Sequence, residues 1–167
     1  GQNTLGGARI GYLPQEITLD ANSLTVWGYL WEGRPIKELE AELNRVYDAL
    51  ADENQSQEPL LARMAEVQER LEYYDCYRAE DILQGIINNM QIEEQLLHMP
   101  LGNLSGGQKS KVAFAQVLHS NPEVLLLDEP TNHLDVSTKS FVTQFLKSYK
   151  GMVLIISHDV DFLNDII

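Results

Sequence analysis

The sequence predicts an α/β fold with a mainly parallel sheet and an inserted antiparallel hairpin of helices. Three short apolar runs, at 8–13, 124–127 and 152–156, are typical of buried strands. Segments with helical spacing separate these runs, and such alternation favours parallel strands joined by helices. Two of the helical segments follow each other closely and carry narrow apolar stripes, which indicates a pair of helices packed side by side.

The length and composition are those of a soluble globular protein. The chain has 167 residues, of which 44% are hydrophobic and 22% are charged. No apolar run approaches the roughly 20 residues that span a bilayer, so we expect no direct membrane insertion. No secretion signal opens the sequence, and the lone Cys76 cannot form an internal disulfide. These features predict a cytoplasmic protein.

The charge balance argues against a broad surface that binds nucleic acid. The chain has 12 basic and 25 acidic residues, a net charge of −13. Between Glu32 and Asp81 there are 14 acidic and 6 basic residues, a net charge of −8. A solvated helical surface explains this excess without any partner.

The first strand and the hairpin come from the first half of the sequence. Gly6-Gly7 indicates a turn before a strand that ends at Pro14, and chemistry often lies at such strand ends. Two helical segments with a polar loop at 51–59 between them predict an antiparallel hairpin, which we expect to project because its outer faces are charged. Their apolar stripes are Ile36, Leu39, Leu43, Val46 and Leu50, and Leu60, Met64, Val67, Leu71 and Tyr74.

Further helices and two strands follow the hairpin. The spacing predicts helices over 79–90 and 109–119, with a less regular stretch from Gln91 to Asn103 between them. The run 124–127 predicts a central strand covered on both faces, and 152–156 predicts a second buried strand. An amphipathic helix is expected over 141–149, between these strands.

Two adjacent carboxylates, Asp128 and Glu129, follow the apolar run 124–127 and precede Pro130. Buried carboxylates need a compensating cation or hydrogen-bond donor. In nucleotide hydrolysis, the first carboxylate could hold Mg²⁺ and the second could orient or deprotonate the attacking water. Taken alone, the pair could equally cap the loop or helix that follows.

Ser105, Gly106 and Gly107 stand just before a predicted helix. They offer a hydroxyl and unhindered backbone N–H groups at the positive end of the helix dipole, where an anion such as a phosphate is favoured. An isolated Ser-Gly-Gly is usually a turn with an N-cap. The surrounding motifs must therefore decide between the two interpretations.

Those motifs resemble the ATP-binding-cassette (ABC) ATPases. The family's signature and Walker B motifs resemble Leu104-Ser105-Gly106-Gly107-Gln108 and Leu125-Leu126-Leu127-Asp128-Glu129-Pro130-Thr131. Gln15 resembles the Q-loop glutamine, Asn132-His133-Leu134-Asp135 the D-loop, and Ser157-His158-Asp159 the switch-histidine segment. The five segments stand in the family's order and cover nearly the whole chain. The resemblance implies a partial P-loop NTPase fold, with ATP and Mg²⁺ as the cofactors of the parent protein.

The resemblance also implies a role for each motif residue. Gln15 would sense Mg²⁺ and water, Asp128 would hold the metal, Glu129 would be the general base, and His158 would contact the γ-phosphate. Ser105, Gly106, Gly107 and Gln108 would contact an ATP held by the opposite cassette. Asp135 would help to couple the two ATP sites.

Within the superfamily, the segments Asn132–Asp135 and Ser157–Leu163 resemble the ABC-F branch, whose soluble members carry two cassettes and act on the ribosome. The hairpin is similar to the arm that ABC-F proteins carry in their first cassette, and the segment Gly11–Glu16 resembles the translational-throttle subgroup. The implied partners are a second cassette of the same chain, the ribosome and tRNA. The implied organisation is a partial ATPase core with the Q-loop at 1–31, a helical subdomain with the hairpin arm at 32–98, and the remaining motifs at 99–167.

No Gly-x-x-x-x-Gly-Lys-Ser/Thr sequence (Walker A) occurs in the 167 residues, and the family order would place it before Gly1. That loop supplies backbone N–H groups and a lysine for the phosphates, and a hydroxyl for Mg²⁺. We therefore expect this chain alone neither to bind ATP tightly nor to hydrolyse it. Two other functions stay open: the ATP-binding subunit of an ABC transporter, and a non-catalytic interaction module.

Overall fold

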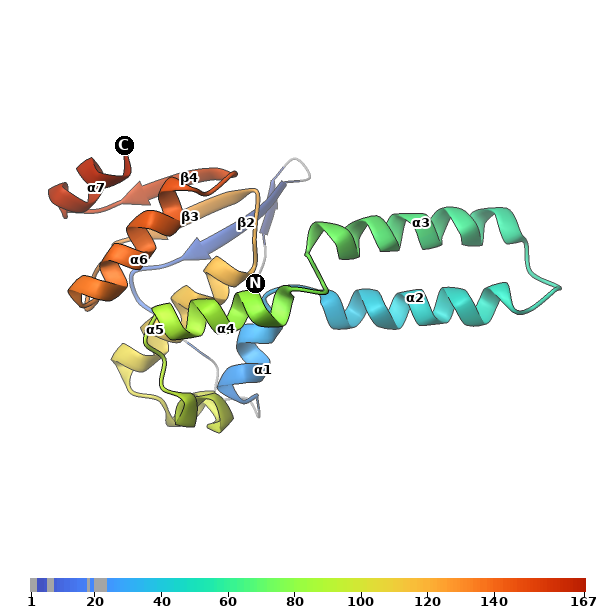
Figure 1. The fold of residues 1–167 in the computed structure, drawn as a ribbon, viewed down its shortest axis with the longest axis horizontal. Helices are drawn as coiled ribbons and strands as arrows, with labels where there is room; N and C mark the ends of the chain where they lie inside the picture. Colours follow the sequence, from blue (N-terminus) through green and yellow to red (C-terminus); the bar gives the residue numbers. More distant parts are fainter. Residues whose placement is uncertain (1–2, 6–7, 18, 20–23) are drawn as a thin grey trace. The chain divides into compact units, whose positions relative to one another are not determined.

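A computed structural model describes residues 3–5, 8–17, 19 and 24–167 of the chain. The expected turn at Gly6-Gly7 lies outside the described residues. The chain forms two compact units, one made of Gly1–Gly33 with Leu83–Ile167 and one of Arg34–Ile82. The first unit contains the sheet, and the second contains the pair of long helices (Figure 1).

The sheet has the strand order β1-β2-β3-β4. β1 pairs antiparallel with β2, whereas β2, β3 and β4 are parallel, which confirms the prediction of a mainly parallel sheet. In the register, Tyr12 lies opposite Leu126, and Leu126 lies opposite Leu154. The strands are β1 (Asn3–Leu5), β2 (Ala8–Leu13), β3 (Val124–Asp128) and β4 (Met152–Ile156).

One face of the sheet forms the core. Leu13, Leu125 and Leu127 on this face are at most 4% exposed. Gly11 lies on the same face, where a Cβ atom would be 2.7 Å from Cγ of Pro122 and 3.4 Å from Cγ1 of Val117. A glycine at position 11 therefore lets the strand approach the helix that carries Val117.

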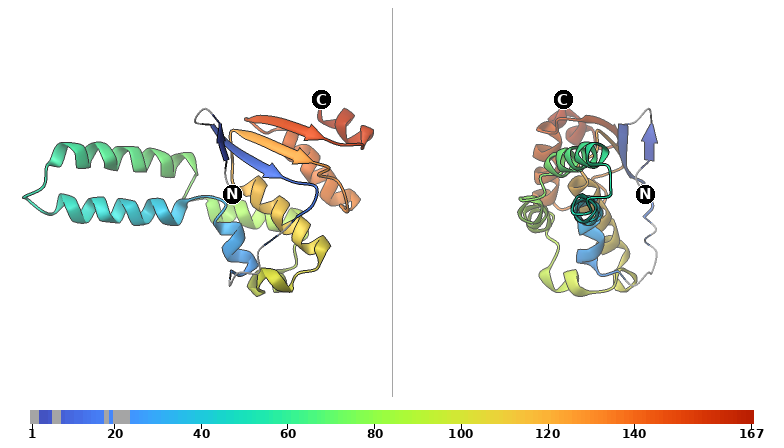
Figure 2. Two further views of the ribbon diagram at one scale, coloured as in Figure 1. Left: turned by 180° about the vertical axis from the view of Figure 1, so that it is seen from behind. Right: turned by 90° about the vertical axis from the view of Figure 1, so that its right-hand side faces the viewer.

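The other face is largely uncovered by the described residues, so the prediction of burial on both faces was wrong. Met152, Leu154 and Ile156 are 61%, 51% and 65% exposed, and Tyr12 is 50% exposed. Figure 1 shows helix α6 (Val136–Lys147) in front of the strands, and Figure 2 shows the strands in front when the molecule is viewed from behind. An apolar run predicts a strand, but the helices packed on the sheet decide which of its side chains are buried.

Polar caps set where two of the helices begin, three to five residues earlier than their apolar spacing predicts. Asp135 accepts a hydrogen bond from the N–H of Thr138 at 2.8 Å, so α6 begins at Val136. Ser105 caps α5 in the same way. The remaining helices are α1 (Val26–Trp31), α4 (Ala79–Asn89), α5 (Gly106–His119) and α7 (Val160–Ile166), with short 3₁₀ helices η1 (Glu94–His98) and η2 (Leu101–Asn103).

Across the part of the chain that the structure describes, every helix is too short or too polar to span a lipid bilayer.

The second unit confirms the predicted pair of helices, α2 (Ile36–Leu50) and α3 (Gln57–Tyr73), which lie side by side (Figure 1). α3 begins within the stretch predicted as a loop. Six members of the predicted apolar stripes are at most 7% exposed: Ile36, Leu39, Val46, Val67, Leu71 and Tyr74. The Arg63 side chain donates to Glu42 at 2.6 Å, and the Arg34 side chain donates to the carbonyl of Tyr74 at 2.6 Å. These contacts join the two helices along their length and at their base.

Candidate functional site

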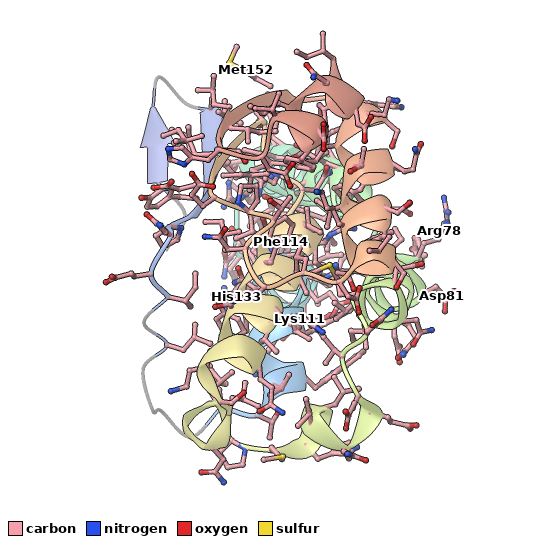
Figure 3. The ribbon with its side chains drawn as sticks, turned by 90° about the vertical axis from the view of Figure 1, so that its left-hand side faces the viewer. Arg78, Asp81, Lys111, Phe114, His133 and Met152 are labelled. Atoms are coloured by element: carbon pink, nitrogen blue, oxygen red, sulfur yellow. The ribbon has the colours of Figure 1, made fainter. Side chains whose placement is uncertain are left out.

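A pocket in the first unit brings together four of the residues predicted for the site: Gln15, Gly107, Asp128 and Glu129. They come from the loop after β2, the first turn of α5, and the end of β3. The other residues that line it are Leu13, Pro14, Ile17, Ser110, Lys111, Phe114, Pro130, Asn132, His133 and Leu134. Figure 3 labels three of these, Lys111, Phe114 and His133.

The two carboxylates of this pocket lie at the carboxyl end of strand β3. Asp128 ends β3 and pairs with Ile156 of β4. The next residue, Glu129, has a φ of 49°, in the left-handed region that non-glycine residues rarely adopt. The N–H of Glu129 donates to the carbonyl of Ile156 at 2.7 Å. This bond helps to hold a backbone conformation that costs of order 1–3 kcal/mol, and such strained residues cluster at functional sites.

His158 lies against the Glu129 carboxylate. Nδ1 of His158 is within hydrogen-bond distance of one carboxylate oxygen of Glu129, and the backbone N–H of His158 donates to the other at 3.3 Å. The Glu129 side chain is 9% exposed, whereas the His158 side chain is 96% exposed. The histidine therefore contacts the carboxylate with one ring nitrogen while the rest of its ring faces outward.

The start of α5 is a reciprocal cap. The Ser105 hydroxyl accepts from the N–H of Gln108 at 3.2 Å, and the Gln108 side chain accepts from the N–H of Ser105 at 2.9 Å. Ser105, Gly106 and Gly107 are all exposed. Gly107 lines the pocket, whereas Ser105 and Gly106 are not among the described residues that line it. The cap thus orders the backbone of the helix start and leaves it open to an approaching group.

Asp135 lies at the end of the loop Asn132–Asp135 and outside the residues that line the pocket. Its carboxylate accepts from the backbone N–H of Thr138 at 2.8 Å and from the hydroxyl of Ser137 at 3.3 Å. The bonds from Thr138 are the main cause that lowers the pKa of Asp135, so this carboxylate is ionised at neutral pH. Within the same loop, His133 has a φ of 65°, a second left-handed residue near the pocket.

The pocket also contains residues that sequence reasoning missed. Ser110, Lys111 and Phe114 line it together with Gly107. Their positions, three, four and seven residues after Gly107, place them on one face of α5. This spacing could have identified them once Gly107 was chosen. Lys111 adds a basic residue to the lining of a pocket that also contains the two carboxylates, and its charge contributes to lowering the pKa of Asp135.

The side chains present fit a magnesium ion. Asp128 supplies carboxylate oxygens and Gln15 supplies an amide oxygen to one pocket, and Mg²⁺ prefers oxygen ligands. Mg²⁺ is usually held by one or two carboxylates, with water and substrate phosphates completing its octahedral shell. The structure therefore offers an acceptable partial set of ligands in the residues that the sequence predicted.

The chain is similar to several known proteins along most of its length. Among curated relatives, the chain is 35% identical over 161 residues to the energy-dependent translational throttle protein EttA of Mycobacterium tuberculosis, covering 96% of this chain and 28% of that protein. It is 31% identical to the uncharacterized ABC transporter ATP-binding protein YfmM of Bacillus subtilis, covering 95% of this chain and 31% of that protein. It is 35% identical to the ATP-binding protein Uup of Escherichia coli, covering 84% and 22%. The chain thus spans less than a third of the length of each of these relatives.

Solved structures share the fold. The dimeric structure of MJ0796, a bacterial ABC transporter cassette, matches with a TM-score of 0.54 and 25% identity, covering 93% of this chain and 55% of that one. The ATP-binding subunit of an ABC transporter matches with a TM-score of 0.61 and 16% identity, covering 95% and 56%. The ABC transporter family itself matches residues 3–132. Because that match covers well over half of the sequence, the chain belongs to the ABC transporter family of ATP-binding proteins.

Proposed function

We propose that this chain supplies the metal, base, signature and switch residues of an ATP-hydrolysing cassette. The observation that carries the proposal is the contact between His158 and Glu129, next to a pocket that also holds Asp128 and Gln15. The motif residues lie far apart in the sequence, and a nucleotide hydrolase needs them together around one phosphate and its metal.

Each residue has a role in this proposal. Glu129 accepts the proton of the attacking water, and its largely covered carboxylate is directed by the His158 contact. His158, exposed over most of its ring, contacts the γ-phosphate. Asp128 and Gln15 would hold Mg²⁺, and the ion would supply positive charge to the phosphate oxygens.

The signature residues serve a second ATP. Ser105, Gly106 and Gly107 are exposed at the positive end of α5, a helix of 14 residues with ordered backbone N–H groups. In the proposal, they contact the phosphates of an ATP bound to a second cassette, with Gln108 as their cap, and Asp135 couples the two sites. The relative MJ0796, which was solved as a dimer, supports a paired arrangement.

The substitution Glu129→Gln tests the chemistry. In a protein that joins this chain to the phosphate-binding loop of its own gene, the variant should bind MgATP with unchanged affinity and lose at least about 100-fold in kcat, because the amide cannot accept the proton. Calorimetry and phosphate release measure the two quantities. Glu40→Gln, at an exposed glutamate of α2, is the matched control. Unchanged hydrolysis in Glu129→Gln would show that another group is the base.

This chain by itself is proposed to be inactive, since the phosphate-binding loop is not among its 167 residues. A calorimetric titration of the chain with MgATP should give no saturable binding below about 1 mM. Micromolar affinity would contradict that expectation and would assign the phosphate contacts to residues of this chain.

We further propose that the parent protein acts in translation, on the ribosome and its tRNA, rather than as a transporter subunit. Two observations support this: a relative named a translational throttle protein, and the pair of helices α2 and α3 inserted between Gln15 and Ser105. The hairpin unit is acidic, so any nucleic-acid contact there would be local.

Sedimentation distinguishes the candidate functions. With ATP, the full-length Glu129→Gln protein should move with ribosomes through a sucrose gradient, because hydrolysis no longer resets the bound state. The wild-type protein should do so less. Recovery with membrane permeases instead of ribosomes would favour the transporter subunit. Ribosome binding that is the same with and without ATP would favour the non-catalytic interaction module.

A further inference from the structure

Asp159, the residue after His158, is fixed to the core through helix α7. One oxygen of its carboxylate, Oδ1, accepts from the N–H of Phe162 at 3.0 Å and so caps the helix. The N–H of Asp159 donates to the hydroxyl of Ser157 at 3.0 Å. Phe162 is fully buried. The carboxylate that follows the switch histidine is therefore held at a defined place on the domain.

The other oxygen, Oδ2, reaches a different segment. It accepts from the hydroxyl of Thr131 at 3.3 Å and forms an ion pair with Nζ of Lys139. Thr131 stands directly before the loop Asn132–Asp135, and Lys139 stands four residues after it, in α6. A single carboxylate oxygen thus contacts a residue on each side of that loop.

The loop between these two anchors is braced internally. The N–H of Leu134 donates to the carbonyl of Thr131 at 3.2 Å, and the N–H of Lys139 donates to the carbonyl of Asp135 at 2.9 Å. The hydrogen bond from Lys139 is the largest cause that lowers the pKa of Asp159, followed by the N–H of Phe162. The carboxylate is therefore charged at neutral pH, as the ion pair requires.

We propose that Asp159 is a positioning residue that links the loop Asn132–Asp135 to His158, so that displacing one moves the other. The inference rests on the proposed function, in which Asp135 faces a second cassette and His158 contacts the γ-phosphate. Asp159 itself touches neither the nucleotide nor the water. It transmits the arrival of the second cassette to the residue that contacts the phosphate.

The substitution Asp159→Asn isolates the link. Asparagine caps a helix about as well as aspartate, with its single amide oxygen in the place of Oδ1. Its amide nitrogen then takes the place of Oδ2, where it can donate to the Thr131 hydroxyl but loses the attraction of Lys139. Asp161→Asn, an exposed position in the first turn of α7, changes the same charge and is the matched control. Urea unfolding should show both variants to be similarly stable.

Amide hydrogen exchange of this chain without nucleotide reports the link directly. In Asp159→Asn, exchange should rise at both 132–135 and 157–159, by about two- to fivefold, the range for a partly exposed ion pair. Asp161→Asn should leave both segments unchanged. A rise confined to one segment, or an equal rise in the control, would overturn the proposal.

Salt and a second substitution identify the ion pair as the cause. In 1 M NaCl, wild-type exchange at 132–135 should approach that of Asp159→Asn, because salt screens the pair. Lys139→Met should reproduce the effect of Asp159→Asn, and the double variant should exceed neither single one. Additive effects would mean that the two residues act separately and would overturn the link.

Kinetics of the ATP-hydrolysing parent show whether the link serves the reaction. Asp159→Asn should lower kcat by about two- to fivefold and leave KM for ATP unchanged, since the residue does not bind ATP. A change in KM alone would refute the positioning role. If the wild-type protein hydrolyses no ATP, the proposed function fails, whereas the exchange experiment still decides whether the two segments are linked.

Discussion

Replacing Ser105 separates two roles of its side chain, the cap of α5 and the proposed contact with a phosphate. Ser105→Ala removes one of the two reciprocal bonds with Gln108. Loss of an N-cap serine costs about 0.5–2 kcal/mol. Because Ser105 is exposed, water replaces the lost acceptor, and we expect a loss of about 1 kcal/mol.

Ser105→Asp keeps the cap and changes the charge. Aspartate accepts from the same N–H, and its negative charge at the helix start is favourable by about 0.3–1 kcal/mol. The folded chain should therefore be as stable as the wild type, or slightly more stable. A carboxylate would nevertheless repel a phosphate, so ATP-dependent association of two cassettes should be lost in the parent protein.

Urea unfolding followed by circular dichroism measures the stability of both variants, and small-angle X-ray scattering of the parent protein with MgATP measures the association of its two cassettes within one chain. Asn103→Asp, an exposed change two residues before the cap, adds the same charge and is the control. If Ser105→Asp is as destabilised as Ser105→Ala, the capping explanation is wrong. If Ser105→Asp associates normally with ATP, the proposed phosphate contact is wrong.

Four further predictions concern packing, surface and pH. Gly11→Ala should lose about 1–3 kcal/mol in thermal unfolding, since its Cβ would lie 2.7 Å from Pro122; unchanged stability would mean that the proline moves freely. Leu154→Lys, on the uncovered face, should change stability by less than about 0.5 kcal/mol and reduce self-association in sedimentation, and a large loss would indicate hidden burial. Folding lowers the pKa of Asp135 from its usual 3.8, so the ionised carboxylate stabilises the fold above about pH 4, and this stabilisation is lost as the pH falls through the pKa of the folded state. Asp135→Asn should remove this part of the pH dependence of the urea midpoint. Burial raises the pKa of Tyr29 from 10.0 to about 12, so the contribution of its neutral side chain to the stability of the fold is complete below pH 10 and is lost as the pH rises through 12. The stability of Tyr29→Phe should therefore fall less in alkali than that of the wild type, and an equal fall would contradict this explanation.

The strands and the hairpin could be predicted because each follows from local spacing. β2 and β4 have the predicted bounds, 8–13 and 152–156. The exposure of Met152 and Ile156 could not be predicted in this way, because burial depends on which helices lie across the sheet. Helix α7 also gave no clear signal, since its seven residues contain one fully buried side chain, Phe162.

For the candidate site, the proximity of some residues could be predicted from the sequence, and their contacts only partly. Asp128 and Ile156 are register partners in neighbouring parallel strands, so the residues that follow them must lie close together. Their proximity therefore follows from the strand order. The direct contact of His158 with Glu129 does not follow from the strand order, because side-chain contacts also depend on backbone torsion angles, and Glu129 has a φ of 49°. The motif spacing indicates which residues are candidates for the site and leaves their torsion angles undetermined.

The bond from Arg34 to the carbonyl of Tyr74 joins the residues just before α2 and just after α3 at the base of the hairpin. The points where the chain enters and leaves the hairpin are therefore fixed. Adding seven residues to each of α2 and α3 would lengthen the pair by about 10 Å at 1.5 Å per residue and would keep its apolar seam in register. A hairpin lengthened by whole heptads would therefore keep the same base and the same apolar seam.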